Sequence, residues 1–222
     1  MSDSTKCYSC DKATLEMLKK AKQDNIETVW DRAEAMQPQC GFGEMGLCCT
    51  ICSMGPCRIV KVSEDGPKKG ICGATEDTMA ARNFARAVAA GSAAHSDHGR
   101  DIAKALKFAA QNGGEIKNVE KLKELAEEWG IDTEKYDEKQ IALKVANLAL
   151  KEFGKVEGNL RFTKRAPKGT YKAWEKVDIV PRAIDRDIVE VLHSTHMGCD
   201  ADYRNITRSA FRAALGDGWG GS

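Results

Sequence analysis

The run CGFGEMGLCCTICSMGPC at residues 40–57, completed by Cys72, decides how the early part of this chain folds. The segment around it, 38–73, holds six of the nine cysteines, is rich in glycine and has no hydrophobic periodicity. Such a segment cannot bury an apolar core of its own, so a metal centre is the obvious candidate for folding it.

Four of these cysteines have the spacing C-x2-C-x4-C-x14-C, and they are Cys49, Cys52, Cys57 and Cys72. Four thiolates from one short segment can hold a cubane iron–sulfur cluster or a tetrahedral zinc ion. Zinc sites made of four cysteines usually pair two C-x2-C knuckles, and this segment contains one. The glycines also favour a cluster, because bare backbone can approach its sulfides closely and donate N–H groups. The spacing therefore favours iron–sulfur and leaves zinc as the alternative.

A second centre is indicated by Cys48, which directly precedes Cys49. Neighbouring side chains usually point in different directions, so we expect the two to face different centres. Cys40 and Cys48 then remain as a C-x7-C pair that supplies two thiolates and needs two more. The simplest source is a second copy of the chain, with the centre on a twofold axis. The alternative is that both are buried thiols without a metal.

The rest of the chain predicts helices and no convincing set of strands. Helical spacing is expected over 11–36, with a break at Asp24-Asn25. Thr75 is expected to cap a helix that Gly91 stops. Apolar spacing predicts further helices over 96–111, 119–129, 141–153, 184–192 and 204–215.

The predicted fold is therefore mainly α, with one cluster-binding loop near the start. Residues 155–182 are expected to be irregular. We divide the chain into an N-terminal helical segment, the cluster-binding loop and a helical domain that looks cut short, at 1–37, 38–73 and 74–222.

Composition argues against several classes of partner. Lysine and arginine number 34 against 33 acidic residues, so the net charge of +1 offers no field to attract nucleic acid or an anionic membrane. The polar start predicts no signal peptide, and the longest apolar runs are too short to span a bilayer. The expected location is the cytoplasm, where nine cysteines indicate metal ligands rather than disulfides.

The cysteine run, with GPCRI at 55–59 and GICGA at 70–74, resembles the anaerobic nickel carbon monoxide dehydrogenases. Other stretches are similar to the same family: WDR at 30–32, AHSDH at 94–98 and MGCDAD at 197–202. The resemblance covers most of the chain and is weakest across 113–180. The cysteine motif has a looser likeness to the hybrid-cluster proteins.

The resemblance implies ligands for two kinds of cluster. An intermediate [4Fe–4S] cluster would be held by Cys49, Cys52, Cys57 and Cys72. Cys40 and Cys48 would hold a [4Fe–4S] cluster shared between the subunits of a homodimer. The family's helical N-terminal domain is followed by Rossmann-like domains that this chain lacks. Those domains supply the ligands of the catalytic Ni-Fe-S cluster, so this chain alone is expected to be inactive.

The resemblance also implies a role for His95, which aligns with a histidine near the active cluster that helps to move protons. His98 matches the next member of a histidine chain, but later members correspond to Asp101 and Lys104, so a complete relay is not expected. Without the family, His95 and His98 would be interpreted as ordinary histidines at a helix start.

The implied reaction converts carbon monoxide and water reversibly to carbon dioxide, two protons and two electrons. This portion would conduct electrons between the Ni-Fe-S cluster and an external carrier such as ferredoxin. Some family members also join an acetyl-CoA synthase partner. The alternative is a free-standing iron–sulfur dimerisation or electron-transfer module without catalysis.

The remaining cysteines and histidines receive no ligand role. Cys7 and Cys10 lie outside the family's ligand set and are expected to be unliganded. Cys199 is interpreted as a packed thiol, and His193 and His196 as structural. The glycine-rich run GDGWGGS at 216–222 is interpreted as a cut end and not as a tail packed on a core.

Overall fold

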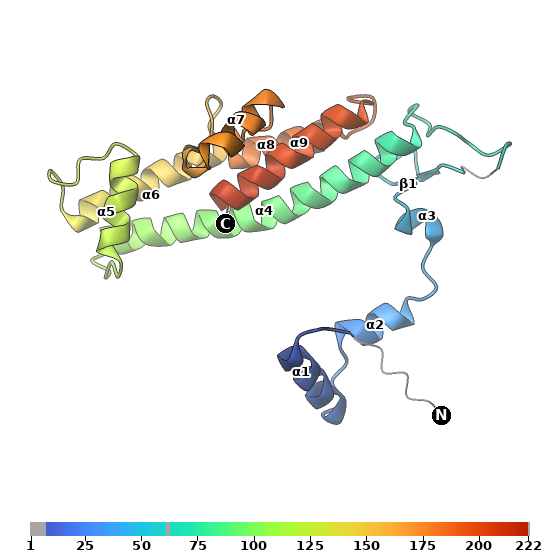
Figure 1. Ribbon diagram of the computed structural model, residues 1–222, viewed down its shortest axis with the longest axis horizontal. Coiled ribbons are helices and arrows are strands. Elements are labelled where there is room, and N and C mark those ends of the chain that lie inside the picture. Colours follow the sequence, from blue (N-terminus) through green and yellow to red (C-terminus); the bar gives the residue numbers. More distant parts are fainter. Residues whose placement is uncertain (1–7, 61–62, 222) are drawn as a thin grey trace. The chain divides into compact units, whose positions relative to one another are not determined.

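The computed structural model describes residues 8–60 and 63–221, and nearly all of its regular structure is helical (Figure 1). The predicted mainly α fold is confirmed. Internal contacts divide the chain into two units, Met1–Glu44 and Met45–Ser222. The three-part division expected from composition stays a prediction.

Within residues 8–44, the described part of the first unit, the helices are α1 (Lys12–Gln23), α2 (Val29–Ala35) and α3 (Gly41–Glu44). The predicted break is confirmed, because Asn25 adopts a left-handed φ of 54° after α1. Thr28 and Asp31 then form a capping box that starts α2. All described residues of this unit, 8–44, are at least partly exposed.

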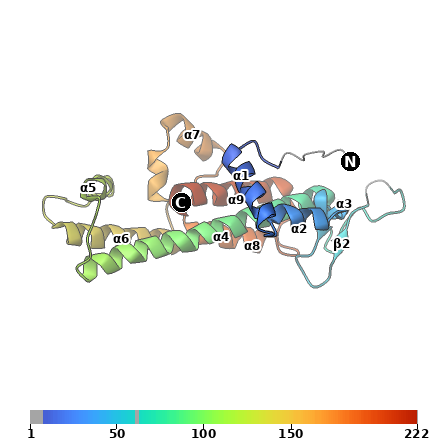
Figure 2. The same cartoon turned by 90° about the horizontal axis from the view of Figure 1, so that it is seen from below.

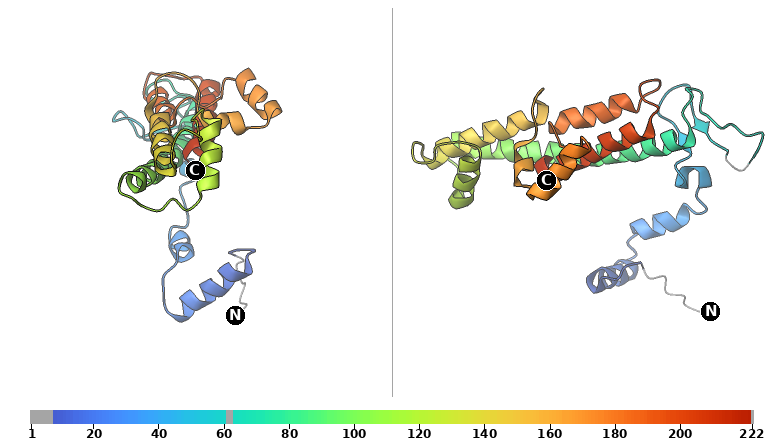
Figure 3. Two further views of the ribbon diagram at one scale, coloured as in Figure 1. Left: turned by 90° about the vertical axis from the view of Figure 1, so that its left-hand side faces the viewer. Right: turned by 45° about the horizontal axis from the view of Figure 1, so that its top comes forward.

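The second unit is built on α4 (Glu76–Gln111), a single helix of 36 residues. Thr75 caps it as predicted, and its side chain accepts a hydrogen bond from the Thr78 backbone. The predicted stop at Gly91 is wrong, because the helix continues through it. A glycine inside a helix costs only about 1 kcal/mol relative to alanine. Neighbouring helices pack along both halves of α4 and offset that cost (Figure 3).

Four predicted helices are confirmed: α5 (Val119–Glu128), α6 (Glu138–Gly154), α8 (Ile184–Ser194) and α9 (Tyr203–Gly216). Helices α6, α8 and α9 each pack against α4. Much of the core between them is alanine, which lets the helix axes approach closely. Its buried members are Ala81, Ala85, Ala89, Phe153, Leu160, Ile184, Ile188, Val191, Ile206, Ala210 and Ala213. None of the described helices is both long and apolar enough to cross a bilayer.

The stretch predicted to be irregular, 155–182, contains two helical elements, which is a correction. They are the 3-10 helix η1 (Arg161–Arg165) and α7 (Lys168–Lys176). Pro167 lies at the N-cap of α7, and proline is tolerated where a helix begins. Glu152, which is buried, accepts hydrogen bonds from the Arg161 backbone and side chain and so fixes η1 against α6.

The glycine-rich end is also ordered, contrary to its interpretation as an unpacked tail. Residues Asp217–Gly221 form a π-helical turn, η2, that follows α9 and contacts α4 (Figure 2). A methyl group on Gly99 would lie 2.6 Å from the Gly221 carbonyl oxygen, so the two backbones touch. Trp219 packs edge to face on Trp174, with 5.7 Å between ring centroids. These contacts hold the turn against the core.

Candidate metal centre

A two-stranded antiparallel pairing positions the first cysteines of the site. Strand β1 (Cys48–Cys49) pairs with β2 (Cys57–Arg58), and the register places Cys49 opposite Cys57. The Ile59 backbone N–H extends the pairing by donating to the Leu47 carbonyl oxygen at 3.0 Å. The segment between the strands, which carries Cys52, is therefore closed into a loop.

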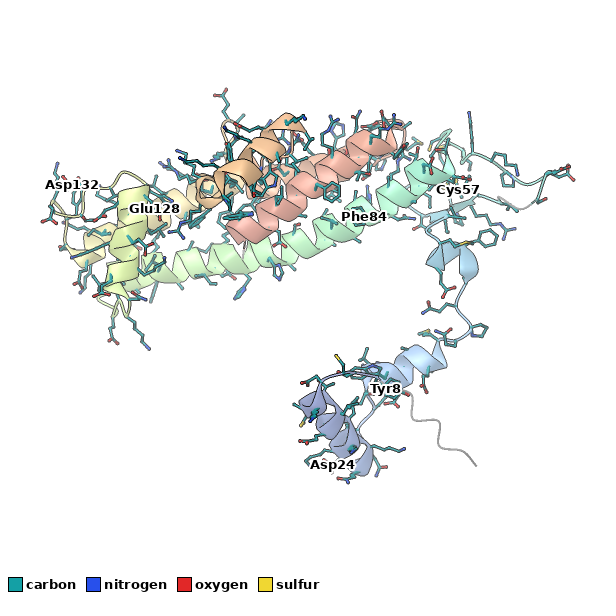
Figure 4. All side chains as sticks on the ribbon, viewed as in Figure 1. Tyr8, Asp24, Cys57, Phe84, Glu128 and Asp132 are labelled. Atoms are coloured by element: carbon teal, nitrogen blue, oxygen red, sulfur yellow. The ribbon has the colours of Figure 1, made fainter. Side chains whose placement is uncertain are left out.

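One pocket gathers all four predicted intermediate-cluster cysteines, which are Cys49, Cys52, Cys57 and Cys72. It lies where the loop meets the first turns of α4, and Figure 4 labels Cys57 at this point. Met79 and Arg82 of α4 and Met197, from the turn before α9, complete its wall. The structure thus brings together residues that are up to 148 positions apart, between Cys49 and Met197.

Two glycines are required by the close approach of backbone around these cysteines. A methyl group on Gly55 would lie 3.1 Å from the Cys49 carbonyl oxygen and 3.2 Å from the Cys57 nitrogen. A methyl group on Gly70 would lie 2.6 Å from the terminal carbon of Met79 and 3.6 Å from the Cys57 sulfur. Of these two glycines, Gly55 lines the pocket, so bare backbone forms part of its wall as the glycine content predicted.

Cys72 lies in an environment that favours its thiolate. Burial alone would raise the pKa of the Cys72 thiol, but the Ala74 backbone N–H and the Arg82 side chain stabilise the anion and lower that pKa. Nη1 of Arg82 donates to Cys72 Sγ at 3.5 Å. A thiolate is the form that binds a metal, so this environment suits a ligand.

The loop has an apolar anchor that the sequence did not suggest. Ile59 is fully buried against Met79 and Ala74, whereas the whole 38–73 segment was expected to bury no core. The side-chain amide of Asn83 adds hydrogen bonds to the carbonyl oxygens of Gly46 and Cys48 at 3.1 and 2.8 Å. Helix α4 therefore holds both strands, and the segment around them does not depend on metal alone.

The donor set fits an iron–sulfur cluster better than a single ion. A tetrahedral zinc ion needs four sulfurs about 2.3 Å from one point. Among the described residues, no three His, Cys, Asp or Glu side chains are grouped closely enough to hold one metal ion. A cubane binds each thiolate on a different iron, so its ligands stand farther apart than those of a single ion. Four thiols line one pocket together with Gly55, and four thiolates are the ligand set of a cubane.

The second predicted pair falls in two different units. Cys40 belongs to Met1–Glu44 and Cys48 to Met45–Ser222. Cys40 is exposed and Cys48 is half-buried, so the alternative of two buried thiols is wrong for Cys40. The shared cluster stays a prediction.

His95 lies in the middle of α4, not at a helix start, and its side chain is 59% exposed. Its Nδ1 lies 2.9 Å from Oδ1 of Asp217 in η2. No sequence signal selected Asp217, because the run around it was interpreted as a cut end. His98, also on α4, is exposed.

The other cysteines that the structure describes lie outside the pocket. Cys199 is exposed, so its prediction as a packed thiol is wrong. Cys10 is exposed, and Cys7 lies outside the described residues. His193 and His196 are exposed at the end of α8, and their structural role stays a prediction.

Known proteins match this chain closely over part of their length. Carbon monoxide dehydrogenase 1 of Methanosarcina acetivorans is 48% identical over 217 residues, covering 96% of this chain and 34% of that protein. The solved Ni-free carbon monoxide dehydrogenase of Thermococcus sp. AM4 has a TM-score of 0.87 at 46% identity and covers the same shares. A solved acetyl-CoA synthase/carbon monoxide dehydrogenase, with NiZn[Fe4S4] and NiNi[Fe4S4] clusters in its alpha subunits, has a TM-score of 0.85 at 39% identity, over 96% of this chain and 32% of that one.

The chain therefore spans about a third of the length of the relatives it matches. The sequence model of the Prismane/CO dehydrogenase family matches residues 47–222, which is nearly the whole second unit. The cysteine pocket and the helices behind it lie within that match. The resemblance seen in the cysteine run is confirmed, and the chain belongs to the Prismane/CO dehydrogenase family.

Proposed function

We propose that this chain is the N-terminal, cluster-carrying part of an anaerobic carbon monoxide dehydrogenase. It passes electrons between the Ni-Fe-S cluster of the complete enzyme and an external carrier such as ferredoxin. The observation that carries the proposal is the single pocket at the start of α4 that four cysteines line. Membership of the family supports this assignment over a free-standing iron–sulfur module.

Cys49, Cys52, Cys57 and Cys72 are the proposed ligands of one [4Fe–4S] cluster per chain. When bound, such a cluster takes up and releases one electron at a time. The β1–β2 pairing fixes the positions of Cys49 and Cys57. Met79, which is buried, closes the pocket on the α4 side and keeps water from that wall.

Cys40 and Cys48 are the proposed ligands of a second [4Fe–4S] cluster, shared with another copy of the chain. Two thiolates per chain make four in a homodimer, which is the number of ligands that a cluster on a twofold axis needs. The partial exposure of both cysteines is compatible with an interface position.

His95 is the proposed proton carrier near the active cluster of the complete enzyme. A carboxylate that accepts a hydrogen bond from Nδ1 fixes the tautomer and leaves Nε2 to take up and release a proton. Asp217 supplies that carboxylate at 2.9 Å. Because His95 is more than half exposed in this chain, its Nε2 is accessible to groups outside it.

The proposed partners follow from relatives. The carbon monoxide dehydrogenase/acetyl-CoA synthase subunit beta of Moorella thermoacetica is 39% identical over 214 residues. We therefore include an acetyl-CoA synthase partner in the proposal, with the cytoplasm as the location.

Metal analysis of the anaerobically purified chain tests this proposal. We expect iron and acid-labile sulfide in equal amounts, a brown colour and an electron paramagnetic resonance signal after reduction. A colourless protein that contains zinc and no sulfide would overturn it.

A further inference from the structure

Arg82 is a buried charge without an acidic partner. It lies in the second turn of α4, and only 2% of its surface is exposed. Among the described residues it makes no ion pair with a carboxylate; its acceptors are Cys72 Sγ at 3.5 Å and the Asp200 carbonyl oxygen at 2.6 Å. Buried charges in proteins are normally paired, because a charge that is removed from water without a partner loses its hydration free energy. The negative group beside Arg82 is therefore the Cys72 thiolate, together with any centre that this thiolate holds.

The guanidinium also has an unused donor. Arg82 Nε is buried and has no hydrogen-bond partner among the described residues. A buried donor without an acceptor costs about 1–3 kcal/mol, so such groups usually mark a missing partner. Arg82 is itself part of the wall of the cysteine pocket. The pocket is thus where the missing acceptor for Nε belongs, and Cys72 already brings negative charge to it.

We propose that Arg82 is a positioning residue for the centre held in this pocket, and that it raises the reduction potential of that centre. This inference rests on the proposed cluster at Cys49, Cys52, Cys57 and Cys72. Reduction adds a negative charge, which a neighbouring guanidinium stabilises. A hydrogen bond to a ligand sulfur acts in the same direction, because it withdraws electron density from the thiolate.

A second arginine on the same helix provides a matched control. Arg86 lies one turn after Arg82, and its Nε donates to Thr195 Oγ1 at 3.0 Å while Nη2 donates to the Leu192 carbonyl oxygen at 3.2 Å. Arg82 therefore ties α4 to the turn before α9, and Arg86 ties it to the end of α8. Of the two, only Arg82 lines the cysteine pocket.

The test compares Arg82→Gln, Arg82→Lys and Arg86→Gln in the full chain, purified anaerobically. Iron and sulfide are measured first, and the midpoint potential follows from a redox titration monitored by electron paramagnetic resonance. The signal of the pocket is the one that Cys52→Ser removes. We expect Arg86→Gln to match wild type. Arg82→Gln should lower the equilibrium constant for one-electron reduction at least tenfold, a shift of about 59 mV to more negative potential.

An unchanged midpoint in an iron-replete Arg82→Gln variant would overturn the inference while leaving the proposed cluster intact. If that variant loses its iron, Arg82→Lys decides. Lysine keeps the charge but cannot reach Cys72 and Asp200 together as the planar fork does. The midpoint potential of Arg82→Lys should be more negative than that of wild type. An unchanged midpoint potential in Arg82→Lys, or loss of iron from this variant as well, would count against the inference. A wild-type chain without iron would instead refute the proposed function itself.

Discussion

Cys52 is the proposed ligand whose removal is easiest to interpret. It is half-buried in the loop between β1 and β2, and it lies outside the strand pairing that holds Cys49 and Cys57. We predict that Cys52→Ser loses about four irons per chain, the content of one cubane. Cys199→Ser is the control, because that thiol is exposed and outside the pocket. Equal iron in the two variants would contradict the assignment.

The loss of iron in Cys52→Ser should change hydrogen exchange unevenly along the cysteine loop. Hydrogen exchange should speed up in residues 50–56, which depend most on the metal for their position. Exchange at Ile59 should change little, since its side chain is fully buried against Met79 with or without metal. Uniform loosening up to Val60 would show that this apolar anchor is weaker than its burial indicates.

His95 should matter for turnover and not for cluster content. We predict that His95→Ala in the complete enzyme slows carbon monoxide oxidation about a hundredfold, the usual contribution of a positioned proton carrier. Asp217→Asn should slow it less, because the imidazole remains but its tautomer is no longer fixed. His193→Ala, an exposed histidine at the end of α8, is the control. Wild-type turnover by His95→Ala across the pH range would reduce His95 to a structural residue.

At this scale the sequence predicted the cysteines of the pocket better than the residues that support them. Cysteine spacing is a local signal, so the four pocket cysteines could be predicted from the sequence before the fold was known. The role of Asp217 depends on a contact with a residue 122 positions away, which no local pattern encodes. Arg82 was missed for the same reason, since its backbone acceptor on Asp200 is 118 positions away.

At the scale of elements, α4 shows that a single residue does not decide where a helix ends. Gly91 was expected to end a helix, but nothing lies within 4 Å of a methyl group placed on it, and it sits in helical backbone. At Gly91 tertiary packing, and not local propensity, decided the boundary. The start of α7 at Pro167 is by contrast a local effect, because proline is tolerated where a helix begins. Thr75 was a reliable signal because its capping hydrogen bond is local.

The same helix supplies a pair of opposite predictions for stability. Gly91→Ala should stabilise the chain by about 0.5–1 kcal/mol, because it removes backbone freedom from the unfolded state without a clash. Gly99→Ala should destabilise it, since the added methyl group would lie 2.6 Å from the Gly221 carbonyl oxygen. Thermal unfolding followed by circular dichroism measures both. A rise in melting temperature for Gly99→Ala would show that η2 does not pack on α4 as described.

At the scale of the whole molecule, the shared cluster links metal content to assembly. The Cys40→Ser, Cys48→Ser double variant should lose one cubane per dimer and keep the two intermediate clusters. Wild type should then hold about twelve irons per dimer and the variant about eight, from four irons per cluster and twofold symmetry. Dimer mass is a poor readout because the rest of the interface can hold the subunits together.

The control for this count is Cys10→Ser, since Cys10 is exposed in the first unit and outside both proposed ligand sets. It should retain about twelve irons. If the double variant also retains them, Cys40 and Cys48 are not ligands and the shared cluster does not exist in this chain.

The continuity of α4 through Gly91 has a mechanical consequence. Arg82 and His95 stand on one unbroken rod, about 20 Å apart along its axis at the 1.5 Å rise per residue of an α-helix. A hinge at Gly91 would let the two positions swing independently. Because α4 has no hinge there, it keeps the proposed site of electron transfer at a fixed distance from the proposed site of proton exchange.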